Sequence, residues 1–354
     1  MKKIGILFGR ENTFPPALVD RINSKNVKGI MAEPVKIDRV VQGENSGYAV
    51  ILDRISQDVP FYRSFLKNAA ATGTAVINNP FWWSADEKFF NNVLMTKIGV
   101  PVPKTVLLPS NARPDDTTEE SFRNLEMPLA WPEMIEYIGG FPAYMKPHSG
   151  GGWKSVYKLN SIEELFEKHQ ETGQLVMMLQ ENIDFDDYFR CYCIGQEQVH
   201  IMPYEPRNHF HERYLPKSEA DYPKEQMELV RETVLKINKA LGYDFNTVEL
   251  AFRNGIPYAI DFCNPAPDAD DFSVGPENFE WVVENMANYL IERAQNQDDN
   301  KNNLSWGEFV RGAVAETAPV KKTTRKRAAA PKKAAPKKAT AKKAAPKKAA
   351  SKAK

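Results

Sequence analysis

The first 80 residues alternate short apolar runs with amphipathic segments. Apolar runs near residues 3–8, 28–37, 47–53 and 75–77 predict strands, and segments ending near residue 22 and spanning residues 61–71 predict helices. Strands and helices that alternate at this length are typical of an α/β layer with a parallel sheet. Asn78-Asn79-Pro80 interrupts the pattern. We therefore expect a first α/β domain over residues 1–84.

A mixed pattern follows, in which predicted strands come closer together. Ser84, with Glu87 three residues later, is typical of a capping box at the start of a helix that runs to Ile98. Further strands are predicted near residues 105–108, 143–146, 155–159, 175–180, 189–194, 199–203, 247–253 and 258–262, and further helices from residue 161 and over 223–241 and 277–293. Asn254-Gly255 between the last two strands indicates a hairpin. We expect a second, α+β domain over residues 85–294, with a polar surface insertion at 110–130.

The composition changes after residue 294. Residues 295–318 are expected to form a polar linker and a short helix at 305–314, whereas residues 319–354 contain 13 Lys, 2 Arg and no acidic residue. The rest of the chain therefore has 47 − 15 = 32 basic and 46 acidic residues, a net charge of −14. Proline in a five-residue repeat (Ala-Ala-Pro-Lys-Lys) blocks a stable helix, and no large apolar residue is present to form a core. We expect a disordered tail.

Such a tail binds polyanions by releasing their counterions, without reading a sequence. Its lysine, alanine and proline composition resembles the tails of linker-histone-like proteins. The partner is DNA, RNA, an anionic polymer or the acidic body of the chain itself, and a solubility or tethering role is the alternative.

The cysteines and the apolar runs limit the class of protein. Cys191, Cys193 and Cys263 are odd in number, and two of them lie one residue apart on a predicted strand, which argues against a disulfide framework. The N-terminal apolar run is too short for a signal peptide, and no run approaches the ~18 residues that span a bilayer. We expect a cytoplasmic protein with no membrane partner.

A glycine-rich loop is the first candidate for chemistry. Lys146 ends a predicted strand, and Gly150, Gly151 and Gly152 follow before the next one. Glycines let backbone N–H groups approach an anion closely, and a lysine adds a point charge for phosphate. A flexible hairpin turn is the alternative interpretation.

Two carboxylates and an amide form the second candidate. Glu249 lies on one strand of the late hairpin, and Asp261 and Asn264 lie at the end of its partner. Buried carboxylates need partners, and oxygen ligands of this kind suit Mg²⁺, which completes its shell with phosphate and water. Salt bridges together with an Asn-Pro turn are the alternative.

These segments together resemble the ATP-grasp superfamily, which includes D-alanine–D-alanine ligase, glutathione synthetase and the ribosomal-protein glutamate ligases. The resemblance covers about residues 75–290, in order. The blocks that carry it are Asn78-Asn79-Pro80, Asp86-Glu87-Lys88, Val100-Pro101-Val102-Pro103-Lys104-Thr105, the loop from Ala143 to Trp153, Gln180-Glu181-Asn182-Ile183, Arg190 to Gly195, and Glu249 with Asp261 and Asn264.

The resemblance implies a site for each part of the nucleotide. Lys88, Lys146 and the three loop glycines are implied to contact the ATP phosphates. Gln180, Glu181, Asn182 and Ile183 would form the hinge between two lobes and contact adenine and ribose. Glu249, Asp261 and Asn264 would hold Mg²⁺ or Mn²⁺. Arg190 would face phosphate or a substrate carboxylate.

Two departures from the family pattern matter. The family shows Glu-x-Asn, whereas Asp261 and Asn264 have two residues between them, and a one-residue slip on a strand turns a side chain to the other face. Either a bulge restores the convergence or Asp261 is not a bridging ligand. Tyr188 replaces the family's acidic residue two positions before Arg190, so Asp187 or Asp186 is expected to take that place.

The implied activity is that of an ATP-dependent carboxylate–amine ligase. A substrate carboxylate attacks the γ-phosphate, and an amine then attacks the acyl phosphate. Arg207 and Arg213, in the polar loop over residues 203–214, are further candidates for binding acidic groups, although a solvated loop is the alternative. An ATP-grasp kinase or inactive nucleotide-binding module, and a nucleic-acid-associated protein acting through its tail, are the rival functions.

Overall fold

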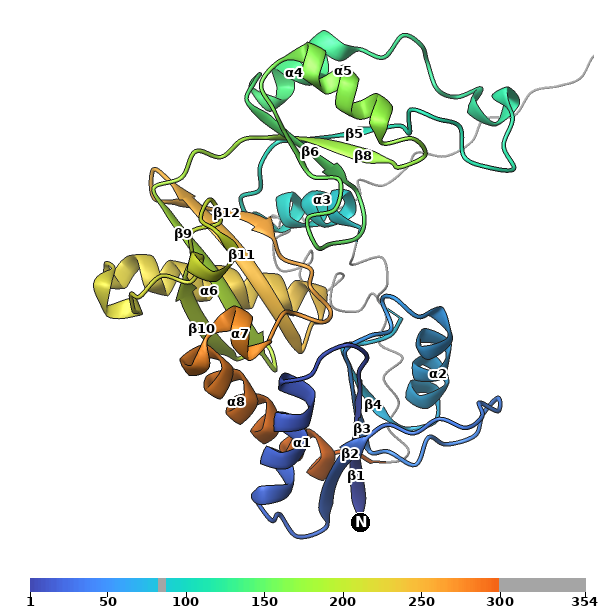
Figure 1. Ribbon diagram of the computed structural model, residues 1–354, viewed down its shortest axis with the longest axis vertical. Coiled ribbons are helices and arrows are strands. Elements are labelled where there is room, and N and C mark those ends of the chain that lie inside the picture. Colours follow the sequence, from blue (N-terminus) through green and yellow to red (C-terminus); the bar gives the residue numbers. More distant parts are fainter. Residues whose placement is uncertain (82–86, 299–354) are drawn as a thin grey trace, which may run out of the picture. The chain divides into compact units, whose positions relative to one another are not determined.

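The computed structural model describes residues 1–81 and 87–298, and the chain divides into two units, Met1–Ala318 and Pro319–Lys354. The first unit opens with a parallel four-stranded sheet in the order β2-β1-β3-β4 (Figure 1). Its elements are β1 (Lys2–Leu7), α1 (Phe14–Ser24), β2 (Ile30–Pro34), β3 (Val50–Asp53), α2 (Pro60–Ala71) and β4 (Ala75–Ile77). The predicted parallel α/β layer is confirmed.

Alternate side chains of this sheet enter two different cores. Ile4 and Ile6 pack in one cluster with α1 and with α8 (Pro276–Gln295), and Leu7 and Ile51 pack in another with α2. Gly5 lies on the α2 side, where a Cβ atom would come within 2.6 Å of the Val35 side chain. The sheet is thus covered by α1 and α8 on one face and by α2 on the other (Figure 1).

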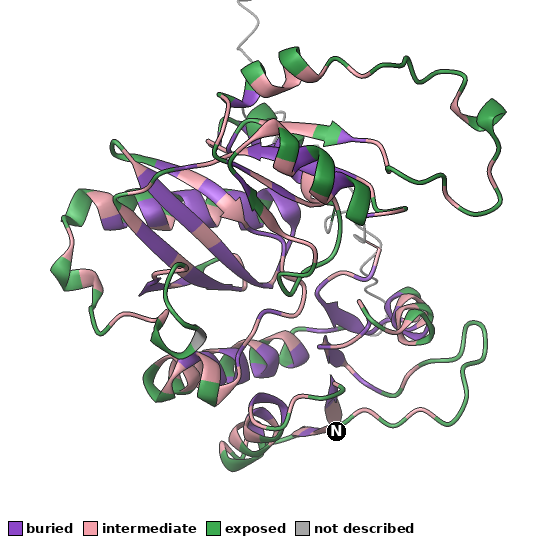
Figure 2. Ribbon diagram, turned by 45° about the horizontal axis from the view of Figure 1, so that its top comes forward, coloured by how far each residue is buried: buried purple, intermediate pink, exposed green. Residues whose placement is uncertain are grey.

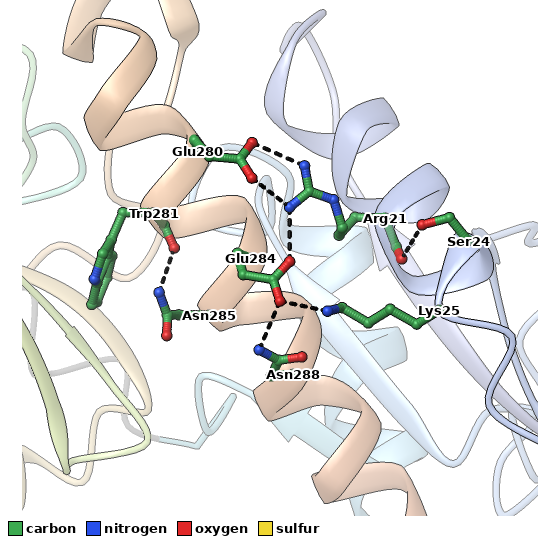
Figure 3. A network of polar contacts seen from close by, with 8 residues as sticks. All are labelled: Arg21, Ser24, Lys25, Glu280, Trp281, Glu284, Asn285 and Asn288. Atoms are coloured by element: carbon green, nitrogen blue, oxygen red, sulfur yellow. Dashed lines mark hydrogen bonds and ion pairs between the residues drawn. The ribbon is translucent and has the colours of Figure 1, made fainter.

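Helices α1 and α8 are joined by a network of ion pairs (Figure 3). Arg21 donates to Glu280 and Glu284 at 2.8 Å each, and Lys25 donates to Glu284 at 2.5 Å. The side chains are partly exposed, so each pair contributes ~0–1 kcal/mol. The network orients α8, which comes late in the chain, against the first domain's helix.

Two antiparallel sheets follow, in the orders β5-β8-β6-β7 and β10-β9-β11-β12. The first consists of β5 (Thr105–Leu108), β6 (Ala143–Pro147), β7 (Tyr157–Leu159) and β8 (Met177–Glu181). The second consists of β9 (Asp187–Ile194), β10 (Gln198–Pro203), β11 (Phe245–Arg253) and β12 (Ile256–Asp261). The helices of this part are α3 (Lys88–Ile98), α4 (Trp131–Ile138), α5 (Ile162–Glu171), α6 (Lys224–Leu241) and α7 (Asp271–Val274), with 3₁₀ turns at Glu119–Phe122, Phe210–Glu212 and Glu219–Asp221.

The second antiparallel sheet has one face in the core and one face toward the candidate site. Phe189, Cys191 and Cys193 of β9 pack with α6 and α3 in one cluster. Their neighbours Tyr188 and Arg190 alternate with them and therefore point to the opposite face. Figure 2 shows these strands as largely buried. On its second face this sheet carries the predicted site residues Arg190 and Glu249, while Tyr192 and Ile194 further along β9 pack in the core cluster of α8.

His200 of β10 packs against α8. Its ring stacks on Trp281 with 4.7 Å between centroids, and its Nε2 atom lies 2.7 Å from Asn278 Oδ1. Burial lowers the pKa of His200 below its ordinary value. The neutral imidazole is therefore the form that the folded protein favours.

Several predicted boundaries differ from the structure. α3 begins at Lys88 with Glu87 as its N-cap, so the predicted start near residue 84 was wrong, and Ser84 itself lies outside the described residues. α4 was not predicted, although Pro132 in its first turn and Gly139 in the left-handed conformation at its end are typical helix signals. The predicted helix at 305–314 and the basic tail lie outside the described residues. Among those described, no helix is long and apolar enough to span a bilayer.

Candidate active site

The carboxylates of Glu249 and Asp261 meet across the β11–β12 hairpin because β12 contains a bulge. Leu250 pairs with Ala259, but Glu249 pairs with Asp261, so Ile260 is an extra residue on β12. A bulge of this kind returns the following side chain to the face that it would otherwise leave. Ala259 packs in the α6 core, whereas Ile260 packs with Tyr188 on the other face. This bulge brings Glu249 and Asp261 to the same face of the hairpin, whereas the two-residue spacing between Asp261 and Asn264 is unchanged by it.

Two lysines from other elements lie beside Asp261. Lys88, the first residue of α3, donates from Nζ to Asp261 Oδ1 at 2.9 Å, and Lys146 of β6 lies with its Nζ 3.4 Å from the Ile260 carbonyl oxygen. Lys88, Lys146 and Asp261 line one small cavity together with Cys263. The structure thus brings both predicted phosphate-binding lysines to the predicted metal carboxylate.

The charges in this cluster strongly perturb one another. Burial and the positive charge of Lys88 lower the pKa of Lys146 to about 8. Burial acts to raise the pKa of Asp261, but the ammonium groups of Lys88 and Lys146 outweigh it and lower that pKa. Burial raises the pKa of Glu249. Two ammonium groups beside buried carboxylates suit a polyanionic ligand, which the ammonium groups attract directly and the carboxylates hold through a bound cation.

Glu249 has two further neighbours on β9. The Tyr188 hydroxyl donates to Glu249 Oε2 at 2.5 Å, and Arg190 Nε lies 3.9 Å from Oε1. Burial raises the pKa of Tyr188 well above its ordinary value, so it stays a donor. The residue that departs from the family pattern therefore holds a candidate metal ligand in place. Residue spacing alone gave no sign of this contact, because it joins positions 61 residues apart.

Three buried polar atoms lie on or beside the same face without a hydrogen-bond partner among the described residues: Arg190 Nε, Tyr214 Oη and Thr247 Oγ1. Arg190 and Thr247 come from adjacent strands, and the Arg190 guanidinium lies over the Tyr204 ring at 5.8 Å. Buried polar groups normally have partners. A ligand bound at this face would supply polar partners for them.

The oxygen donors fit a hard divalent cation. Asn264 donates from Nδ2 to the Thr247 carbonyl at 3.0 Å, which leaves its Oδ1 atom as an acceptor beside the end of β12. Within the described ranges no group of three or more His, Cys, Asp or Glu side chains forms a metal site by itself. Two carboxylates and an amide oxygen suit Mg²⁺, which takes its remaining ligands from phosphate and water. Oxygen ligands of this kind bind soft metals, which prefer sulfur ligands, only poorly.

The glycine loop connects β6 to β7 and is exposed. Gly150 and Gly152 have φ values of 92° and 69°, and a Cβ atom on any of Gly150, Gly151 and Gly152 would meet no atom within 4 Å. Their conformation, rather than crowding, explains the glycines in this structure. At the start of the loop, the Lys88 N–H donates to the His148 carbonyl at 2.6 Å. The loop is thus tied to the helix that supplies Lys88.

The hinge residues show mixed roles. The buried Gln180 amide donates to Thr105 Oγ1 at 2.9 Å, and Ile183 packs in the cluster of Tyr188. Glu181 accepts from Arg253 Nη1 at 2.8 Å and from the Lys104 N–H at 3.1 Å. The Gln180 and Ile183 side chains are therefore occupied by the fold, and β8 is paired on both sides through residues 180 and 181, so the predicted nucleotide contacts of this segment stay predictions. Within the described ranges, no contact of the Asn182 side chain distinguishes it.

Within residues 1–81 and 87–298, Asp187, Arg207 and Arg213 make their contacts outside the carboxylate cluster. Asp187 accepts from Gln226 Nε2 at 2.9 Å. Arg207 is held by Glu205 and lies 4.2 Å from the centre of the Phe185 ring. Arg213 lies 5.6 Å from the centre of the Trp153 ring in the glycine loop. The loop at 203–214 therefore contacts the glycine loop, and the roles predicted for its arginines stay predictions.

Comparison of the sequence with family models and with curated proteins gives no match. Solved structures do match the fold. The VanG D-Ala:D-Ser ligase from Enterococcus faecalis has a TM-score of 0.60 at 17% identity, over 83% of this chain and 99% of that one. D-alanine–D-alanine ligase from Bacillus anthracis, complexed with ATP, has a TM-score of 0.57 at 16% identity, over 83% and 98%. The ATP-grasp ligase PsnB, complexed with minimal precursor, Mg and ADP, has a TM-score of 0.55 at 14% identity, over 83% and 98%.

Proposed function

We propose that this protein, which has the ATP-grasp fold, uses Mg-ATP to activate a substrate carboxylate for attack by an amine and so forms an amide bond. The observation that carries the proposal is the convergence of Glu249 and Asp261 with Lys88 and Lys146 from four separate elements, β11, β12, α3 and β6. The structural neighbours are ligases that act with ATP or on peptide precursors, and the extent of their likeness supports the same class of reaction.

Different residues bind the phosphates and the cation in the proposed reaction. Lys88 and Lys146 neutralise phosphate oxygens, and the glycine loop supplies backbone N–H groups to the same oxygens. Glu249, Asp261 and Asn264 hold the cation. A bound Mg²⁺ would supply positive charge that reduces the negative charge opposing a carboxylate nucleophile. The lowered pKa of Lys146 does not prevent this role, because an anionic phosphate favours its charged form.

Arg190 is placed to bind the substrate carboxylate. Its Nε atom is buried and has no hydrogen-bond partner in the described part of the chain, and Thr247 on the neighbouring strand has a free hydroxyl by the same measure. A carboxylate oxygen bound there attacks the γ-phosphorus atom while ADP leaves. The amine nitrogen then attacks the acyl carbon, loses a proton, and inorganic phosphate leaves. The glycine loop excludes water from the acyl phosphate between the two steps.

The test is phosphate release by the full chain with Mg-ATP and a panel of amino acids and short peptides. The proposal predicts release that requires both a carboxylate and an amine, and that is lost in Asp261→Asn. Asp116→Asn, which changes an exposed carboxylate of the 110–130 insertion, is the matched control and is expected to keep full activity. Release that needs only a carboxylate or a hydroxyl acceptor would instead identify a kinase.

A further inference from the structure

A second cavity lies in the first domain, apart from the carboxylate cluster. It has a volume of about 480 Å³ and is lined by residues 6–8 at the end of β1, residues 34, 35 and 37 after β2, and residues 59, 61 and 62 at the start of α2. The side chains that line it are apolar apart from the Tyr62 hydroxyl, among them Val35, Ile37 and Phe61, and polar atoms of the lining residues also face the cavity. Phe61 is 55% exposed, which is unusual for a phenylalanine on a short helix and indicates that its ring forms the rim.

The cavity is at the edge of the sheet where open α/β domains bind ligands. In a parallel sheet, all strands end at the same edge, and ligands bind in the crevice outside those ends. Here β1 and β2 end at Leu7 and Pro34, and both contribute to the cavity. The position alone therefore marks it as a candidate binding site.

The same edge of the sheet contacts the segment that follows the metal-binding strand. After β4, Asn78 Nδ2 donates to the Pro265 carbonyl at 3.0 Å. After β3, Arg54 Nη2 donates to the Pro267 carbonyl at 2.8 Å. After β1, Thr13 donates to Asp270 at 3.1 Å. The loops at the ends of three strands thus reach residues 265–270, one to six residues beyond Asn264. A ligand in the cavity would share this edge with the candidate active site.

The size and the lining select the kind of ligand. Ligand pockets have volumes of about 300–1,000 Å³, and an apolar cavity of about 150 Å³ is enough for a benzene ring. Among residues 1–81 and 87–298, no Asp, Glu, Lys or Arg side chain lines this cavity. A charged side chain would lose its hydration there without gaining an oppositely charged partner from these residues, whereas an aliphatic or aromatic side chain would gain by leaving water.

We propose that this cavity is a specificity site for a large apolar side chain of the substrate, an amino acid or a peptide residue of the leucine or phenylalanine class. That the bound molecule is a substrate rests on the proposed ligase function, whereas the presence of the binding site does not depend on it. The apolar side chain is held at the edge of the first domain, while the carboxylate or amine of the same molecule extends toward the cluster beyond β12.

The experiment measures binding without nucleotide, using saturation-transfer NMR on the full chain. The probes are L-leucine, L-phenylalanine, Leu-Leu and Phe-Phe, with glycine, L-glutamate and Gly-Gly as polar or small comparisons. Phe61→Ala removes the rim of the cavity at an exposed position, where folding is least affected. Phe166→Ala, an exposed phenylalanine of α5, is its matched control.

A second variant changes the cavity without lowering the stability of the fold. Val59 is the N-cap residue of α2 with extended backbone angles, and its side chain makes no capping hydrogen bond. Val59→Asp adds a favourable cap while it places a carboxylate in the cavity wall. It is expected to fold at least as well as the natural chain and to lose binding of the apolar probes.

The expected result is binding of the apolar probes alone, about tenfold weaker in Phe61→Ala, absent in Val59→Asp and unchanged in Phe166→Ala. Equal binding of apolar and polar probes, or unchanged binding in Val59→Asp, overturns the proposal. If the apolar probes bind as described but no carboxylate–amine pair releases phosphate, the cavity is confirmed as an apolar binding site and the ligase function is refuted. If phosphate is released but the apolar side chain is absent from the product, the cavity is not a substrate site.

Discussion

The Tyr188 hydroxyl provides a sharp test of how the cation site is held together. Tyr188→Phe removes a single oxygen atom that donates to Glu249 Oε2 at 2.5 Å. This hydrogen bond acts to lower the pKa of Glu249, against the larger effect of burial, which raises it. Without the hydroxyl, the carboxylate is less well oriented and holds its charge less readily, so it should bind Mg²⁺ more weakly.

The magnitude follows from the kind of hydrogen bond that is lost. Hydrogen bonds to charged groups contribute ~1.5–3 kcal/mol, and a loss of about 2 kcal/mol corresponds to about 30-fold in an equilibrium constant. We therefore expect the Mg²⁺ concentration for half-maximal phosphate release, or the dissociation constant of Mn²⁺ measured by electron paramagnetic resonance, to rise about 30-fold. Binding of ATP in the absence of a divalent cation should change little.

Tyr204→Phe is the matched control. It removes a hydroxyl from a buried tyrosine of the same cluster, 6.0 Å from the Tyr188 ring, and that hydroxyl makes no recorded hydrogen bond to Glu249 within the described residues. Its cation dependence should match that of the natural chain. An unchanged Mg²⁺ dependence in Tyr188→Phe, accompanied only by lower stability, would show that Tyr188 has a packing role and that the reasoning is wrong.

Further predictions address phosphate binding, packing, pH and the tail. Lys146→Ala should weaken ATP binding about tenfold or more in calorimetry, whereas Asn264→Ala should lose turnover with a smaller change in ATP affinity; full activity in both would contradict the site. Gly5→Ala should lower the free energy of unfolding by ~1–3 kcal/mol in urea, because its methyl group overlaps a core side chain, and an unchanged midpoint would contradict this. The folded pKa of His200 is lowered, so its contribution is complete above the unfolded pKa near 6.5 and is lost as pH falls through the folded value; urea titrations from pH 8 to 5 should show a shallower pH dependence in His200→Gln. Deletion of residues 319–354 should abolish salt-sensitive binding to DNA while ATP turnover persists, and DNA binding that survives the deletion would move the polyanion site elsewhere.

Local patterns in the sequence predicted most of the fold. Periodicity placed the parallel sheet, the individual strands of the two later sheets and the long helices, because each has a buried face that repeats every two or every 3.6 residues. Asn254 and Gly255 have φ values of 55° and 76°, which is the turn that their dipeptide indicates. α4 was missed because it is only eight residues long and follows an irregular insertion.

The candidate site was predictable in its residue types but not in its geometry. The off-register spacing of Asp261 and Asn264 left two possibilities open. The bulge at Ile260 pairs Asp261 with Glu249, and the role of Asp261 as a cation ligand stays a prediction. Whether a strand contains a bulge depends on its partner strand, which local sequence does not describe. The contact of Tyr188 with Glu249 is equally non-local. The apolar cavity was not predicted either, because its lining comes from three short segments that are each ordinary core sequence.

The central claim is that a substrate carboxylate oxygen attacks the γ-phosphate of ATP before the amine reacts. The most direct measurement uses a substrate labelled with ¹⁸O in its carboxylate, identified from the phosphate-release panel, and follows the label by mass spectrometry. The account predicts that one ¹⁸O atom appears in inorganic phosphate for each amide bond formed. Phosphate that contains no ¹⁸O and takes its one new oxygen from solvent, with the label staying entirely in the substrate or its amide product, would contradict it.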